Sequence, residues 1–369
     1  MIAVSAVPST SSAHEQLVIA DVTLLYGERS GGIRTYLDEK AAFAAATGAF
    51  EHHVIVPGGR ERHTAGRHEL RAIRLVASNG YRLPLGAGSV KETLRLIRPQ
   101  VVMLHDPFWR PFGITAEAHR LGARVIAVHH ASVAMSAAGV PGPDALYRPL
   151  LKRVYRHAYE NVDAVMSVVD SRADSGREAT LPLRLGLHPA FRPGPAIRRG
   201  HVLYAGRLAW EKGVLDLLEA AAVSRDPWPL WIVGDGPASR AIRARIERLG
   251  IGHRVSLKPF VRDRFELARL YREAACVAQP GPHETFGLVA LEAAASGARV
   301  VACASAPSTR VLGRLVKTFA PGDPVGLARA IDRARASRAD SASAAALADS
   351  LAWPRVFSAE LEDLSRLIG

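Results

Sequence analysis

Two glutamates lie eight residues apart in the segment PGPHETFGLVALEAAASGARVVA, residues 280–302. The apolar pattern predicts a strand that ends near residue 280, a Pro/Gly turn, and a helix that begins near Phe286. Eight residues span little more than two helical turns, so the carboxylates of Glu284 and Glu292 can address one ligand from the same side. A glutamate inside an Ala-rich apolar helix is costly to bury without a partner, and ribose hydroxyls would supply one.

The start of this predicted helix is a second chemical feature. The backbone N–H groups of Phe286, Gly287 and Leu288 would point out of it and form an anion site. Two cations, Arg207 and Lys212, lie around another strand-to-helix turn, in YAGRLAWEKG. A guanidinium and an ammonium at such a turn suit a diphosphate, but the segment fits a surface turn with two solvated cations equally well. It is not a Walker A loop, because the glycine spacing differs and no Ser or Thr follows the lysine.

A glycine pair, Gly31 and Gly32, lies in the first half of the chain, where a loop turns into a helix. Two residues without Cβ let the backbone approach an anion near the helix start. A helix entry with unusual backbone angles is the alternative explanation. The dinucleotide fingerprint G-x-G-x-x-G does not occur in the chain.

Two histidine clusters follow apolar strands in the same half. They are His105 with Asp106, and His129 with His130. Zinc sites usually have local ligand pairs at short spacing, which are absent here, so we favour a polar catalytic or substrate-orienting role over a metal site. A further pair, residues 52 and 53, fits the start of a strand.

Short apolar runs alternate with amphipathic stretches and predict the elements that position these residues. Strands are expected at 17–22, 52–57, 101–105, 124–129 and 163–169, with helices at 33–48, 89–98, 114–121, 144–160 and 171–179. A second series has strands at 201–206, 230–233, 254–257, 275–279 and 299–303, with helices at 212–223, 238–249, 263–274, 286–296 and 325–336. This alternation predicts two Rossmann-like, doubly wound α/β domains, which bind ligands outside the carboxyl ends of their strands.

The predicted organisation has four parts. Residues 1–16 are expected to be a flexible tail, 17–187 an N-terminal domain, 188–351 a C-terminal domain and 352–369 a closing helix. The Pro/Gly-rich stretch 185–200 suits a hinge between the domains. In the turn IVGDGP we expect Gly234 and Gly236 to allow close packing and Asp235 to cap the next helix.

The composition limits the function classes. The chain has 48 basic and 35 acidic residues, a formal net charge of +13. Most of the basic residues are arginine and no run of five or six basic residues occurs, so we expect no nucleic-acid partner, and a coding bias toward arginine competes with a functional basic surface. Cys276 and Cys303 are expected to be small core residues. Without a signal peptide or an uninterrupted apolar stretch of membrane-spanning length, a cytoplasmic location is expected.

Taken together, GRLAWEKG and HETFGLVALE resemble the donor-site signature of retaining GT-B glycosyltransferases of family GT4. The SGGIRTY loop, the HDPF and VHHAS strand ends, the VGDGP turn and the FVRD segment follow in the family's order, so the resemblance covers nearly the whole chain. PGPHETFGL is similar to the string in bacterial mannosyltransferases that use GDP-mannose and act on inositol-lipid or related acceptors. The resemblance implies a GT-B fold, two Rossmann-like domains that face each other across a cleft.

The resemblance also implies roles for the donor-site residues. Glu284 would contact hydroxyls of the transferred sugar, and Glu292 would hold the donor ribose. Arg207 and Lys212 would bind the diphosphate, next to the N–H groups of the helix start.

Other roles follow from the same resemblance. Gly31 and Gly32 would approach the diphosphate from the opposite domain, and His130 would lie near the reacting centre. The backbone near Val261 would read the nucleobase, although Pro259 stands where family members often have glycine.

The implied reaction moves a hexose, such as mannose, from a nucleotide-diphosphate sugar to a lipid-linked or saccharide acceptor. Retention is ascribed in this family to attack on the same face through an oxocarbenium-like state. Preorganised cations and helix-end N–H groups would stabilise the departing diphosphate. Since the chain has no D-x-D motif, we expect no metal ion and no cofactor. Closure about 185–200 would exclude water from the donor.

The acceptor region is less specific. Residues 131–143 are small, apolar and turn-prone, and fit a mobile acceptor loop. The helix after them has a predicted apolar stripe with basic residues elsewhere, namely Tyr147, Leu150, Leu151, Val154, Tyr155 and Ala158 in the stripe and Arg148, Lys152, Arg153 and Arg156 outside it. Such a helix can lie on an anionic membrane surface or pack on the core with a solvated face.

Three other functions compete with a glycosyltransferase. A nucleotide-sugar epimerase of GT-B fold would share the diphosphate site. A catalytically silent subunit that binds nucleotide sugars would have no need of His130 and Glu284, which are both present. A metal-dependent hydrolase of the HD type is disfavoured because His105 and Asp106 end a strand.

Overall fold

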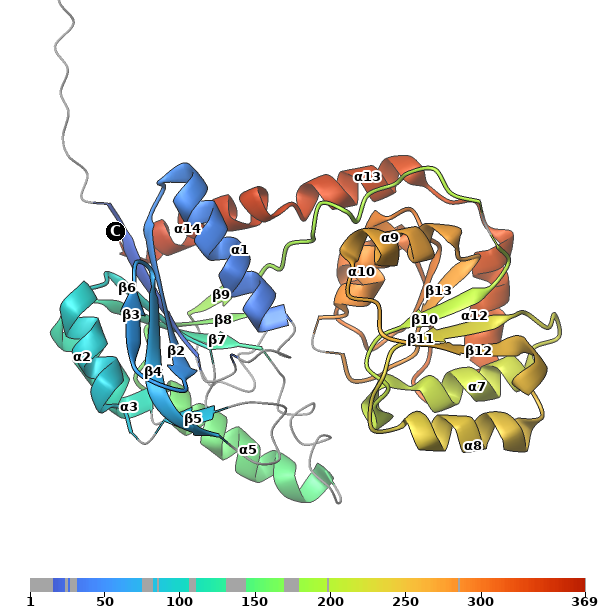
Figure 1. Ribbon diagram of the computed structural model, residues 1–369, viewed down its shortest axis with the longest axis horizontal. Helices are drawn as coiled ribbons and strands as arrows, with labels where there is room; N and C mark the ends of the chain where they lie inside the picture. The colour runs from blue at the N-terminus through green and yellow to red at the C-terminus, as the bar shows by residue number, and fades with distance from the viewer. Residues whose placement is uncertain are drawn as a thin grey trace, which may run out of the picture. The chain divides into compact units, whose positions relative to one another are not determined.

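The computed structural model describes residues 16–23, 26, 32–74, 82–84, 86–105, 111–130, 144–168, 179–197, 199–284 and 286–368 (Figure 1). Contacts between Cα atoms divide the chain into two compact units. Unit 1 comprises Met1–His105 and Arg110–Ile126, and unit 2 comprises Asp106–Trp109 and Ala127–Gly369.

The first sheet is largely parallel and includes the strands expected from the apolar runs. Its strands are β1 (Val18–Val22), β2 (Glu51–Gly58), β3 (Arg62–Thr64), β4 (Arg67–Arg74), β5 (Arg82–Pro84), β6 (Val101–Leu104), β7 (Arg124–His129), β8 (Ala164–Ser167) and β9 (Thr180–Pro182). Hydrogen bonds order them β3-β4-β2-β1-β6-β7-β8-β9, with β5 paired to β4. The pairs β3–β4 and β4–β5 are antiparallel.

Helices connect these strands as parallel pairing requires. They are α1 (Gly32–Thr47), α2 (Gly88–Ile97), α3 (Pro111–Arg120) and α5 (Asp144–Tyr159). Each begins and ends within three residues of its predicted bounds. The helix expected at 171–179 falls almost wholly on residues 169–178, which lie outside the described residues.

The second sheet lies wholly in unit 2 and is parallel throughout. Its order is β12-β11-β10-β13-β14-β15, formed by β10 (Val202–Ala205), β11 (Leu230–Val233), β12 (Val255–Lys258), β13 (Cys276–Gln279), β14 (Val300–Cys303) and β15 (Val316–Phe319). Cys276 and Cys303 are buried in it, as predicted. The two parallel α/β sheets confirm the predicted fold class.

Helices cover both faces of the second sheet (Figure 1). The helices of this half of the chain are α7 (Val214–Val223), α8 (Ser239–Leu249), α9 (Arg264–Glu273), α10 (Leu288–Ala295), α11 (Ser308–Leu312), α12 (Pro324–Ala336) and α13 (Ser341–Ser350), with single 3-10 turns η1 (Trp210–Lys212), η2 (Gly252–Arg254) and η3 (Gly313–Leu315). A last helix, α14 (Trp353–Ile368), follows them. Side chains from α7, α8 and α12 form one buried core with the sheet, and this core includes Trp228. The helices α9 and α10 lie on the other face.

The last helix, α14, is attached to the segment that follows β9. Arg184 forms an ion pair with Asp363 of α14. Leu187 pairs with Ala352 as an isolated β-bridge, and a Cβ on Gly186 would collide with the ring of Trp353. Glycine is therefore required where this segment crosses the start of α14.

The prediction for Asp235 was wrong in detail. Its carboxylate accepts a hydrogen bond from the backbone N–H of Gly236 at 2.7 Å and one from the Ser239 hydroxyl at 3.3 Å. The N-cap residue of α8 is Ala238, so Asp235 tightens the turn before the helix and caps no helical N–H. Close packing at Gly234 is confirmed, because a Cβ there would collide with the carbonyl oxygen of Gly206.

On helix α5 the exposure of the apolar side chains differs from that of the predicted stripe. Tyr155 and Ala158 are buried as expected. Leu150 and Val154, however, are 60% and 36% exposed, and Arg153 and Arg156 are exposed as well. The apolar stripe is therefore divided, with one part on the core and one part in solvent. None of the described helices is long and apolar enough to cross a membrane.

Candidate active site

Two loops at carboxyl ends of the second sheet pack against each other in unit 2. One follows β10 and contains η1, and the other follows β13. A Cβ on Gly213, which has φ +65°, would lie 2.8 Å from the carbonyl oxygen of Pro280. In the loop that follows β13, a Cβ on Gly281 would lie 3.1 Å from the carbonyl oxygen of Glu211 in the first loop. Glycine at these positions lets the two backbones approach closely enough to bring their side chains together.

An ion pair joins the two loops. The Lys212 ammonium lies 2.8 Å from a carboxylate oxygen of Glu284, and the two side chains are 22% and 11% exposed. These residues are 72 positions apart in the chain. The structure thus brings together two of the residues that the sequence analysis selected separately, and it keeps both within reach of a ligand.

Arg207 has a different partner. Its guanidinium forms an ion pair with Glu211, one turn further along, and is 58% exposed. Its backbone carbonyl accepts a hydrogen bond from the buried Tyr204 hydroxyl at 2.9 Å, which fixes the loop at the end of β10. Glu211 was not predicted, because Arg207 precedes the 3-10 turn that contains Glu211 and their contact depends on the path of the loop.

Glu292 lies inside α10 and is buried. The Tyr271 hydroxyl donates a hydrogen bond to its Oε2 at 3.1 Å, and the Arg264 guanidinium lies 3.5 Å from its Oε1. Burial raises the pKa of Glu292 to about 7, against the opposing effects of Arg264 and Tyr271. The sequence analysis missed both partners. They lie seven residues apart on α9, a spacing that puts them on one helix face.

The predicted helix start near Phe286 was wrong by two residues. The helix α10 begins at Leu288, and Gly287 is its N-cap residue with φ +77°. Phe286 precedes the helix and its side chain is buried. Glu284 lies outside the helix, as expected, but four residues before its first residue, so the helical spacing argument does not apply to Glu284 and Glu292. Each of these carboxylates has its own cationic partner, Lys212 and Arg264 respectively.

The remaining predicted residues are placed as follows. His130 directly follows β7 and is partly buried, and Val261 lies in the segment between β12 and α9. Gly32 is the first residue of α1 in unit 1, whereas Gly31 lies outside the described residues.

The first histidine cluster forms a buried charge network in unit 1. His105 Nε2 lies 2.6 Å from one carboxylate oxygen of Asp21, and His52 Nε2 lies 2.6 Å from the other. The Lys40 ammonium is 3.0 Å from the same carboxylate. Burial alone would raise the pKa of Asp21, but Lys40 and the two histidines hold it well below its usual range. Neither Asp21 nor Lys40 was predicted, because Asp21 lies in an otherwise apolar strand and Lys40 follows two acidic residues, where a lysine fits a solvated helix face.

The second cluster also has an internal partner. His129 Nδ1 lies 2.9 Å from the Tyr159 hydroxyl, and the two rings are edge to face. His52 and His53 belong to β2, as predicted. Among the described residues no group of three or more His, Cys, Asp or Glu side chains is arranged to hold a metal ion. Asp106 lies outside the described residues.

Comparison with protein families matches both halves of the chain. The model of Glycosyltransferase Family 4 matches residues 30–182, and the model of Glycosyl transferases group 1 matches residues 193–346. The second match contains the ion pair of Lys212 and Glu284, and also Glu292. The chain belongs to the GT-B glycosyltransferases of family 4.

Curated relatives include proteins of similar length. The GDP-mannose-dependent alpha-(1-6)-phosphatidylinositol dimannoside mannosyltransferase of Mycobacterium tuberculosis (strain ATCC 25177 / H37Ra) is 29% identical, over 95% of this chain and 96% of the relative. The D-inositol 3-phosphate glycosyltransferase of Arthrobacter sp. (strain FB24) is 34% identical, over 47% of this chain and 46% of the relative.

Solved structures support the fold. A sucrose-phosphate synthase from Thermosynechococcus elongatus superposes with a TM-score of 0.75 at 21% identity, covering 95% of this chain and 98% of that one. The Anabaena protein HepE in complex with UDP gives a TM-score of 0.72 at 17% identity, covering 95% and 100%. At these identities the likeness establishes the GT-B fold of the chain.

Proposed function

We propose that this glycosyltransferase transfers mannose from GDP-mannose to an inositol-containing lipid acceptor, with retention at the anomeric carbon and without a metal ion. The observation that carries the proposal is the Lys212–Glu284 ion pair, which joins the two motifs that follow the neighbouring central strands β10 and β13. The sugar and acceptor are proposed from the relative that matches the chain over nearly its whole length.

The donor site is proposed to work through charge. When the bond to the sugar breaks, negative charge develops on the diphosphate, and groups already in place stabilise it without reorganisation. Lys212 and Arg207 would supply this positive charge, together with the N–H groups at the start of α10. In this proposal Lys212 exchanges its partner Glu284 for phosphate oxygens, which leaves the Glu284 carboxylate to accept hydrogen bonds from the sugar hydroxyls.

Glu292 is proposed to hold the ribose of the donor. Its carboxylate already accepts a hydrogen bond from Tyr271, and a carboxylate has further acceptor sites for two hydroxyls. His130 is proposed to lie near the reacting centre, and the backbone near Val261 to contact the nucleobase. Gly31 and Gly32 are proposed to approach the diphosphate.

Contact with an anionic membrane is proposed for α5. The exposed Leu150 and Val154 lie on the same helix as the exposed Arg153 and Arg156. Apolar side chains that enter the interface and cations that pair with lipid phosphates are what such a helix needs. This contact would bring a lipid acceptor to the enzyme at the inner face of the plasma membrane.

The first experiment tests which nucleotide the protein binds and whether Lys212 and Glu284 contribute to the reaction rate. Thermal-shift titration with GDP, UDP and ADP is expected to show the largest stabilisation with GDP, because a ligand that binds the folded state raises its stability. With GDP-mannose and a phosphatidylinositol mannoside, Lys212→Gln and Glu284→Gln are each expected to lower kcat/KM by about 10²- to 10³-fold. Addition of EDTA is expected to leave the rate unchanged.

Lys317→Gln is the matched control. Lys317 is exposed on β15, so the variant removes the same charge away from the donor site and is expected to retain the wild-type rate. Three results would contradict the proposal: a shift with none of the nucleotides, wild-type rates in both donor-site variants, or a β-linked product by NMR.

A further inference from the structure

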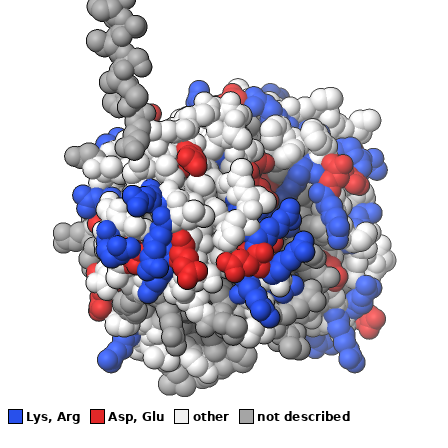
Figure 2. All heavy atoms as spheres, turned by 60° about the vertical axis from the view of Figure 1, so that its left-hand side comes forward, with Lys and Arg blue, Asp and Glu red and all other residues white. Residues whose placement is uncertain are grey.

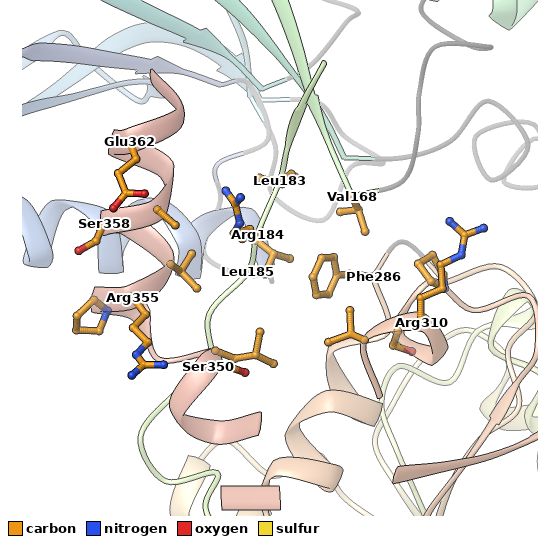
Figure 3. Close-up of a pocket in the computed structure, with 17 residues that line it drawn as sticks. Val168, Leu183, Arg184, Leu185, Phe286, Arg310, Ser350, Arg355, Ser358 and Glu362 are labelled. Carbon is orange, nitrogen blue, oxygen red and sulfur yellow. The ribbon is translucent and has the colours of Figure 1, made fainter. Parts of the chain in front are cut away.

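A pocket of about 660 Å³ lies within unit 2, and neither Lys212 nor Glu284 lines it. It is formed by the segment that follows β9, the short helix α11 and the first turns of α14 (Figure 3). A volume of this size is typical of sites for small organic ligands. Of the residues selected from the sequence, Phe286 alone lines it.

The walls of the pocket are mainly aliphatic. Leu183 and Leu185 come from the segment after β9, Val311 from α11 and Val356 from α14, and Phe286 contributes the one aromatic ring among the described residues of the lining. A single ring offers little opportunity for a nucleobase to stack, so these walls suit an alkyl chain better.

Two guanidinium groups lie at the rim. Figure 3 shows Arg310 and Arg355 on opposite sides of the pocket. Among the described residues neither has an ion-pair partner, whereas the third arginine of the lining, Arg184, is paired with Asp363. Unpaired guanidinium groups beside an apolar wall complement a ligand that has one acidic end and one apolar end.

Ser308 also lines the pocket, but its hydroxyl is closed off from it. The residue is 1% exposed, and a Cβ on Gly287 would lie 2.4 Å from its Oγ. The hydroxyl therefore packs against Gly287, so the charge at the two arginines and the apolar walls are the features that select the ligand.

We propose that this pocket binds a medium-chain fatty acid. The alkyl chain packs between Leu183, Leu185 and Phe286, and the carboxylate pairs with Arg310 or Arg355. The proposal does not depend on the identity of the sugar donor or acceptor, since it uses only the residues of this pocket.

Calorimetric titration of the full chain with decanoate and with decanol, both below their micellar concentrations, tests the proposal. Decanoate is expected to bind with one-to-one stoichiometry and at least about tenfold more tightly than decanol, because only the acid pairs with a guanidinium. In the double variant Arg310→Gln/Arg355→Gln this preference is expected to disappear. The matched control is Arg329→Gln/Arg333→Gln on α12, which removes two exposed charges outside the pocket and is expected to bind like the wild type.

A further variant tests the position of the ligand. Val311→Trp places a large side chain at a half-exposed wall position, where the fold tolerates it, and is expected to abolish binding. Equal binding of decanoate and decanol, an equal loss in the control double variant, or unchanged binding in Val311→Trp would overturn the proposal.

Discussion

The surroundings of the Glu292 carboxyl group shift its pKa. Burial in α10 raises its pKa to about 7, although Arg264 and Tyr271 favour the charged form. A glutamate in the unfolded chain titrates near 4.5. The folded protein therefore binds a proton at Glu292 that the unfolded chain releases, and this group stabilises the fold less as the pH rises from 4.5 through 7.

Glu292→Gln removes this pH dependence. Between pH 5 and pH 8 the variant is expected to gain about 2 kcal/mol of unfolding free energy relative to the wild type, because glutamine has no proton to lose. Urea denaturation at several pH values measures the difference. Glu247→Gln, at an exposed position of α8, is the control and is expected to follow the wild type. A constant difference between Glu292→Gln and wild type across this range would contradict the pKa shift.

Sequence patterns predicted the isolated charged residues of the site better than their partners. Glu284 and Lys212 were selected because each lies at a strand-to-helix turn, and the structure joins them. Tyr271 was not selected, because a tyrosine on an amphipathic helix has the same pattern whether or not its hydroxyl reaches a carboxylate. Asp21 and Lys40 were missed for a related reason: their pairing across 19 residues depends on the packing of α1 against the sheet.

At the scale of elements, the entry into α10 depends on Gly287. Its φ of +77° is a conformation that L side chains rarely adopt, and a Cβ there would lie 2.8 Å from the Cβ of Ser308 and would collide with its hydroxyl. The apolar pattern alone could not place this boundary, because Phe286 is as apolar as the helix that follows. The backbone conformation of the loop that precedes α10 is therefore set by its contact with Ser308 of α11.

Gly287→Ala is expected to cost about 2–3 kcal/mol of unfolding free energy, from backbone strain of about 1 kcal/mol and the collision with Ser308. Gly250→Ala is the matched control. Gly250 has φ +65° at the end of α8, and no heavy atom lies within 4 Å of the position of its Cβ, so only the strain is expected. Chemical denaturation of both variants gives the comparison. Equal losses in the two variants would show that Ser308 does not restrict Gly287.

Strands that are buried on both faces were predicted closely, because continuous apolar runs identify them. The strands β3, β4 and β5 were not predicted. Their sequences are rich in arginine and histidine, and β3 is exposed along its length. The strand β15 was missed for the same reason, since Lys317 and Thr318 between its buried ends are exposed. The strands β3 and β15 each end the order of their sheet, and an edge strand needs less apolar surface than a central one, so its pattern is weaker.

At the scale of the molecule, the chain has a net charge of +13, but basic side chains on its surface form ion pairs with acidic ones. On the face shown in Figure 2 acidic side chains lie between the basic ones. In unit 1, for example, Glu117 is paired with both Arg95 and Arg120. Interleaved charges of this kind do not form the continuous basic stripe that tracks a nucleic-acid backbone. The composition alone could not distinguish a basic stripe from a mixed surface.

The buried network around Asp21 makes one amine of the protein a reporter of unfolding. Lys40 is 1% exposed and is one of only six lysines in the chain. An acylating reagent can reach its amine only when unit 1 opens, whereas Lys317 is always accessible. Mass spectrometry after timed acetylation is expected to find Lys40 modified far more slowly than Lys317.

Asp21→Asn is expected to accelerate the modification of Lys40 about a hundredfold or more, because removal of one partner from a buried ion pair costs about 3–5 kcal/mol. Equal acetylation rates at Lys40 and Lys317 in the wild type would show that the amine is accessible in the folded protein. Otherwise the rate at this single side chain measures how often unit 1 exposes its interior under native conditions.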